Sequence, residues 1–169
     1  MFRERLFWAL AGVVFPISFL VPLWLPADPP SKSERLTPAE SRGKIIYTRG
    51  RSPSGNELSF WLVGGGQRLP AGGVTCATCH GEDGQGGREG NLIVTPDITY
   101  EALTKPGHVT LPSGRKRVPY TDVLLARAIT QGLDSSGQKL NLLMPRWNLT
   151  GSDLQDLIAY LKRLRKEPQ

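Results

Sequence analysis

GVTCATCHGEDGQGG, residues 73–87, places the two cysteines of this 169-residue chain three positions apart, with a histidine directly after the second. Two cysteines can form at most one bridge, so Cys76 and Cys79 exclude a disulfide framework. Thiol redox pairs usually occur where a strand leads into a helix. The residues before Cys76 do not have the sequence pattern of such a strand. A zinc site with Cys76, Cys79 and His80 would need His108 as its fourth ligand, at a spacing that fits no common zinc motif.

Covalent haem attachment accounts for the Cys-x-x-Cys-His pattern more fully. The thiols of Cys76 and Cys79 can add to the two vinyl groups of one haem, and His80 can then ligate the iron. Short helices and long loops bury little apolar surface, and a small domain of this kind benefits from a cofactor in its core. The motif therefore predicts one covalently bound haem c, with His80 as the proximal ligand.

The second axial ligand has few candidates. Met144, in the segment LLMPRW, is the only methionine besides Met1, and Pro145 favours an extended backbone before it. A lone methionine usually fills a core, but methionine and histidine are also a known axial pair of haem c. We therefore predict Met144 as the distal ligand, with His108 as the competing donor.

The N-terminal residues predict a membrane anchor. Residues 6–25, LFWALAGVVFPISFLVPLWL, carry no charge and would span about 30 Å as a helix, which is one hydrocarbon thickness. Arg3 and Arg5 precede this run, so the positive-inside rule keeps the N-terminus cytoplasmic. A cleaved secretory signal is the alternative, although its apolar core is usually shorter. We expect residues 1–27 to be an uncleaved, single-pass anchor in the cytoplasmic membrane, with the rest of the chain on the periplasmic side.

After the anchor we expect a Pro-rich tether at residues 28–37 and a mainly α domain at residues 38–169. Three helices have start signals, with Thr37, Thr121 and Thr150 as their N-caps. The inner face of the second helix is expected to contain Val123, Leu124, Ala128 and Ile129.

Two further features concern the loops and the first helix. Gly43 lies inside that helix, where glycine costs about 1 kcal/mol relative to alanine, so we expect a close helix contact there. Residues 57–63, ELSFWLV, predict a short strand, and the glycine-rich residues 81–90 predict a tight, exposed loop.

In order along the chain, RGKIIYTRG, CATCHGEDGQGG, AITQGLD, LLMPRW and DLQDLIAYLKRL resemble a class I cytochrome c of the monohaem, membrane-anchored bacterial type. The resemblance covers most of residues 38–165 and implies the cytochrome c fold around one covalent haem. In that fold the first and last helices cross at near right angles. Gly43 and Tyr47 are expected on one side of the crossing. Tyr160 and Leu161 are expected on the other.

The resemblance also implies the ligand set. Cys76 and Cys79 correspond to the thioether positions, His80 to the proximal ligand and Met144 to the distal ligand. Pro96 falls where the family often places a proline against the proximal histidine. One departure is the long segment 48–75 between the first helix and the first cysteine, which could cover the haem edge, contact a partner or decorate the surface.

Two occupied axial positions leave no site for a substrate on iron, so we expect an electron carrier rather than an enzyme. The net charge of +6 favours redox protein partners with an acidic docking face, and no nucleic-acid motif accompanies it. We therefore predict a membrane-tethered carrier of single electrons between respiratory redox partners. The alternatives are a haem-c subunit of a larger membrane oxidoreductase, with Trp61 in an interface, and a haem-based redox or gas sensor.

Overall fold

The computed structural model describes residues 35–89, 93–105 and 118–165. The expected anchor at residues 1–27 and His108 lie outside these ranges, as does most of the expected tether. Among the helices that are described, none has both the length and the apolar character needed to cross a bilayer.

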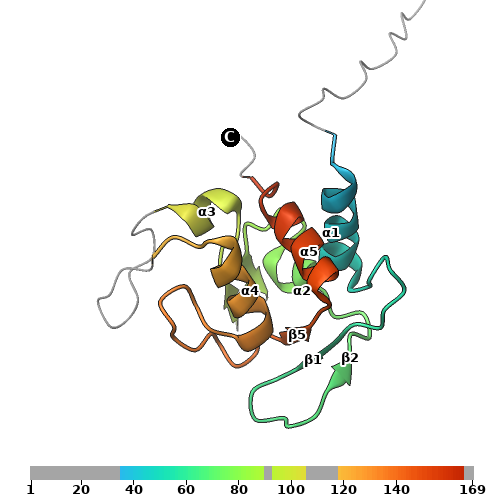
Figure 1. The fold of residues 1–169 in the computed structure, drawn as a ribbon. Helices are drawn as coiled ribbons and strands as arrows, with labels where there is room; N and C mark the ends of the chain where they lie inside the picture. The colour runs from blue at the N-terminus through green and yellow to red at the C-terminus, as the bar shows by residue number, and fades with distance from the viewer. Residues whose placement is uncertain (1–34, 90–92, 106–117, 166–169) are drawn as a thin grey trace, which may run out of the picture.

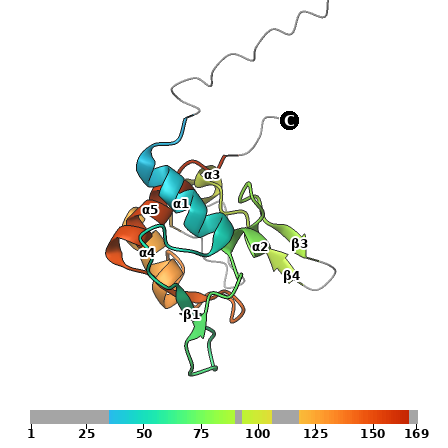
Figure 2. The same cartoon turned by 90° about the vertical axis from the view of Figure 1, so that its right-hand side faces the viewer.

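The described residues form helices and short strands, and the mainly helical prediction is confirmed (Figures 1 and 2). The helices are α1 (Pro38–Arg49), α2 (Cys76–His80), α3 (Tyr100–Thr104), α4 (Asp122–Gln131) and α5 (Gly151–Leu161). The strands are β1 (Ser59–Trp61), β2 (Leu69–Pro70), β3 (Gly87–Glu89), β4 (Ile93–Thr95) and β5 (Arg146–Asn148). One antiparallel sheet has the order β2-β1-β5, and β3 pairs with β4.

The three predicted helices begin where their capping residues indicate. Thr37 accepts a hydrogen bond from the backbone N–H of Glu40, whose carboxylate accepts from the Thr37 N–H, so the capping box of α1 is complete. Thr121 caps α4 by accepting from the Leu124 N–H, and Thr150 caps α5 by accepting from the Asp153 N–H, without the reciprocal bond seen in α1. Helix α4 ends at Gly132, whose φ of 68° is a left-handed conformation that glycine adopts without strain.

Helices α1 and α5 pack closely against each other (Figure 1). A Cβ at Gly43 would overlap the Asp156 carbonyl group and lie 2.8 Å from the Cβ of Tyr160, so the predicted close contact is confirmed. Beside it, the Tyr47 and Tyr160 rings lie 5.4 Å apart between centroids. The Arg42 guanidinium donates two hydrogen bonds to the Asp156 carboxylate, at 2.6 and 2.8 Å.

Gly43→Ala is expected to lower the free energy of unfolding by about 2–3 kcal/mol, because the added methyl group forces the two helices apart. Chemical denaturation of the haem-loaded protein measures this loss. Gly151→Ala is the matched control, since nothing lies within 4 Å of its Cβ position and α5 begins there. Equal stabilities of the two variants would contradict the close contact.

The segment before the first cysteine contributes to the core. Residues 59–70, here called the hairpin, contain β1, its turn and β2, and β1 also pairs with β5 in the register Phe60↔Trp147. The Phe60 and Trp147 rings are buried with centroids 5.4 Å apart. Leu58 and Ala71, on either side of the hairpin, are buried as well. The predicted strand at 57–63 is therefore confirmed in its centre, and the insertion does more than decorate the surface.

Two sequence-based expectations were wrong in part. Val123 is 77% exposed, whereas Leu125, Ala128 and Ile129 form the buried stripe of α4. Residues two apart on a helix point about 200° away from each other, so a stripe through Leu125 excludes Val123. The glycine-rich loop that begins at Gly81 ends in β3, which pairs with β4 instead of remaining irregular.

Candidate haem site

The attachment motif forms the short helix α2. Thr75 caps it by accepting a hydrogen bond from the Thr78 N–H at 3.0 Å, and Gly81 ends it with a φ of 79°. Cys76 is partly buried, Cys79 is exposed, and neither forms a disulfide. Because residues three apart share one face of a helix, α2 presents both thiols on the same side.

His80, the last residue of α2, is only 7% exposed. Its Nδ1 lies 3.0 Å from the Pro96 carbonyl oxygen, which can only accept, so Nδ1 carries the proton and Nε2 keeps its lone pair. Burial lowers the pKa of His80, and the hydrogen bond to Pro96 opposes that shift. A neutral imidazole with a fixed tautomer and a free Nε2 is suited to ligate a metal. The expected position of Pro96 against this histidine is confirmed.

Contacts from α1 and from the C-terminal segment hold α2 in place. The buried Tyr47 hydroxyl donates a 2.7 Å hydrogen bond to the Gly81 carbonyl. Gly86 donates from its N–H to the His80 carbonyl at 2.9 Å, and Leu164 packs against Gly84 so closely that a side chain there would overlap it. Helix α1 and the loop after α2 thereby support the motif, and the segment after α5 packs against that loop.

Tyr47→Phe is expected to lower the free energy of unfolding by about 1–2 kcal/mol, because it leaves the Gly81 carbonyl without this donor. Thermal or chemical unfolding of the haem-loaded variant measures the change. Tyr160→Phe is the control in the same ring pair, since the described residues give its hydroxyl no hydrogen-bond partner. A Tyr47 variant as stable as this control would show that the hydroxyl does not support α2.

Met144 lies on a different segment, in the turn before β5. It is partly buried, and its N–H donates to the Asn141 carbonyl at 3.1 Å. Its own carbonyl accepts from the Arg146 guanidinium. The turn is thus defined by hydrogen bonds on both sides of Met144, which no sequence pattern indicated.

The surroundings of Cys76 disfavour a reactive thiol at this position. Burial raises the pKa of the Cys76 thiol to about 12, whereas reactive cysteines have lowered values. Across the described ranges, no group of three or more His, Cys, Asp or Glu side chains is placed to hold a metal ion. His108, the fourth ligand that a zinc site would need, lies outside these ranges.

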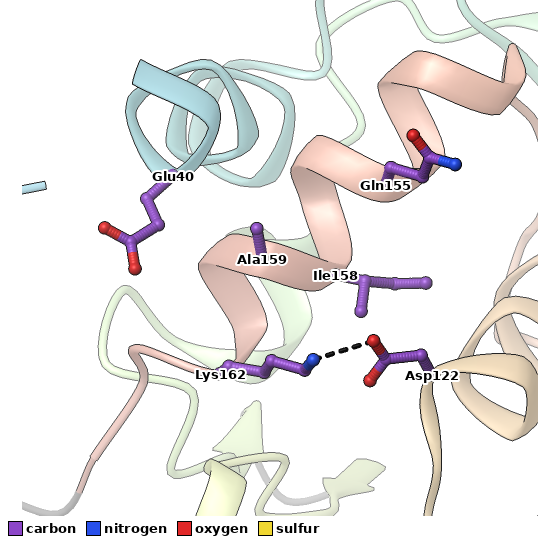
Figure 3. A pocket seen from close by; sticks show the side chains of 6 residues that line it. All are labelled: Glu40, Asp122, Gln155, Ile158, Ala159 and Lys162. Atoms are coloured by element: carbon purple, nitrogen blue, oxygen red, sulfur yellow. Dashed lines mark hydrogen bonds and ion pairs between the residues drawn. The ribbon is translucent and has the colours of Figure 1, made fainter. Parts of the chain in front are cut away.

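A pocket lies between α1, α4 and α5, and it is lined by residues other than those of the haem site (Figure 3). Its volume is about 250 Å³, and its lining residues are Glu40, Asp122, Gln155, Ile158, Ala159 and Lys162. The Lys162 ammonium and the Asp122 carboxylate form a 2.7 Å ion pair across it. None of the four predicted haem residues lines this pocket, so we do not assign it a role in cofactor binding.

The residues present fit a covalent haem in their chemistry. Two unbridged thiols one helical turn apart match attachment through two vinyl groups, and His80 offers a neutral, oriented nitrogen. Met144 offers a thioether, and the flanking Leu142 and Leu143 are 58% and 57% exposed, which provides apolar surface for a porphyrin to cover.

The chain was compared with known protein families. The family described as Cytochrome c matches residues 66–165, which is more than half of the chain and includes α2 and the turn before β5. No curated protein and no solved structure matches the chain. The family binds covalently attached haem c through the Cys-x-x-Cys-His spacing found at Cys76, Cys79 and His80. The chain therefore belongs to the cytochrome c family, and its cofactor is one covalently attached haem c.

Proposed function

We propose that the chain is a membrane-tethered carrier of single electrons, with Cys76 and Cys79 as the thioether residues and His80 and Met144 as the axial ligands. The hydrogen bond from His80 Nδ1 to the Pro96 carbonyl carries the haem part of this proposal, because it leaves the Nε2 of a buried imidazole free on the same short helix as two unbridged thiols. Haem bound here would supply one-electron redox chemistry. The protein residues fix the ligand tautomer and support the attachment helix.

Electron transfer without catalysis follows from the ligand set. A histidine and a methionine together fill both axial positions of a haem iron and raise its potential. A gas sensor needs a ligand that leaves easily. Mixing the reduced protein with carbon monoxide separates these functions: the carrier should keep its spectrum over seconds, and rapid formation of a carbon monoxide adduct would favour a sensor.

The proposed site of action is the periplasmic side of the cytoplasmic membrane. The uncharged residues 6–25, with Arg3 and Arg5 before them, support an anchor in that membrane. The net charge of +6 supports an acidic docking face on the redox partners. Affinity isolation of the haem-loaded, full-length protein from its native membranes tests the membrane location. Repeating the isolation at low and at high salt tests the charged docking. An electron donor or acceptor captured only at low salt is the expected result.

A haem subunit of a larger oxidoreductase is the second candidate, and the hairpin favours it. In Figure 1 the hairpin extends from the body of the domain, and Val63 and Leu69 are 44% and 41% exposed. Exposed apolar side chains on a projecting element are typical of an interface. Sizing the gently solubilised protein distinguishes the two roles, since a free carrier migrates alone and a subunit migrates with its complex.

A further inference from the structure

Arg146 is buried directly beside the proposed distal ligand. Only 2% of it is exposed, although it is a charged residue two positions after Met144. Buried arginines are usually paired with a carboxylate. The described residues provide Arg146 with no carboxylate partner, and its hydrogen bonds all go to backbone carbonyls.

The guanidinium contacts four backbone carbonyls, one directly after α4 and three in the segment before β5. One terminal nitrogen donates to the carbonyls of Asn141, at 3.0 Å, and Met144. The other lies 3.4 Å from the carbonyl oxygen of Gly132 and 3.3 Å from that of Leu140. The rigid fork of an arginine can bridge such a set, whereas a lysine ammonium is a single point with three donors.

The end of α4 is shaped to receive this side chain. Gly132 lies directly after α4, and a Cβ there would overlap the Arg146 guanidinium. The last carbonyls of a helix carry partial negative charge, so a cation is favourable at this position. Gly132 thus serves both as the left-handed end of α4 and as the surface on which the guanidinium lies.

The strand that carries Arg146 is itself fixed by the hairpin. Arg146 begins β5, where it lies opposite Trp61 of β1, and the next pair is Phe60 with Trp147. Both rings of that second pair are buried. The backbone of Arg146 is therefore held on one side by the hairpin, and its guanidinium reaches the Met144 turn from there.

We propose that Arg146 is a positioning residue for Met144: it ties the turn of residues 140–144 to the end of α4, and the hairpin fixes the strand from which it acts. This proposal rests on the proposed function in one respect, since it gives the turn the task of presenting an axial ligand. It also gives the hairpin a role, which is to support the segment that contains the distal ligand Met144.

Arg146→Lys tests the proposal, because it keeps the positive charge and removes the fork. Hydrogen exchange of the haem-loaded, full-length protein should show at least a tenfold faster exchange of the amides of residues 140–144 than in the wild type, with little change elsewhere. The red absorption band of methionine sulfur bound to ferric haem should also disappear at a lower temperature. Arg42→Lys is the matched control, since it weakens the ion pair with Asp156 between α1 and α5.

Exchange at residues 140–144 that equals the wild-type rate, or that rises uniformly over the domain as in the Arg42 variant, would overturn the proposal. If Arg146→Lys does not fold, hydrogen exchange of the wild-type protein tests the proposal instead. The amides of Leu140 and Met144 should then exchange slowly, and exchange as fast as in an unfolded chain would show that the turn is not held in place. A wild-type spectrum without the sulfur band rejects Met144 as the ligand, while the exchange result still decides whether Arg146 holds the turn.

Discussion

The double variant Cys76→Ala, Cys79→Ala is expected to lose covalent haem completely. Without thioether bonds the cofactor can dissociate, and the domain then lacks an apolar body that its short helices and strands cannot replace. A ligand held at 1,000 times its Kd adds about 4 kcal/mol to the stability of the native state, and a covalently attached cofactor should add more. Denatured protein should therefore have the mass of the bare polypeptide, and the purified variant should unfold without a cooperative transition.

Thr78→Ala is the control for this experiment, because it changes the exposed residue between the two cysteines and leaves both thiols in place. It should carry one haem after denaturation. The single Cys79→Ala variant should retain one thioether, through Cys76. Covalent haem in the double variant would show that attachment does not use this motif.

Met144→Ala is expected to produce the second large effect. Loss of the thioether should remove the red sulfur-to-iron absorption band of the ferric protein and convert the iron from low spin to high spin. Axial ligands set haem potentials over about 0.8 V, and the loss of methionine should lower the midpoint potential by roughly 0.2 V. Absorption spectroscopy and a redox titration measure the two changes.

Val123→Ala is the control for Met144→Ala, since it truncates an exposed side chain of α4 that has no part in the proposed site. It should leave the band and the spin state unchanged. A Met144 variant that retains both, with an unchanged potential, would exclude the thioether as the ligand. Another donor, such as His108, would then have to be tested by the same substitution.

Local signals in the sequence were sufficient to predict where the three capped helices begin. The caps at Thr37, Thr121 and Thr150 involve residues only three positions apart, so a short window of sequence contains both partners. The attachment motif is equally local, because α2 contains all of Cys76–His80. The close approach at Gly43 was also predictable, since a glycine inside a helix needs a packing reason.

Long-range contacts were not predictable in this way. Strand β5 has three residues and exists through its pairing with β1, which lies more than 80 positions earlier in the chain. The bond from Tyr47 to the Gly81 carbonyl joins a side chain to a backbone group, so it leaves no trace in residue types. The burial of Arg146 is a third example, since charged side chains are normally exposed and the guanidinium of Arg146 donates to backbone carbonyls.

A redox titration of the haem-loaded, full-length protein, followed by its absorption spectrum, tests the proposed electron-transfer function most directly. A single one-electron wave is expected, with low-spin, six-coordinate iron in both oxidation states. Spectra of high-spin iron in either state, or the absence of a reversible wave, would contradict it.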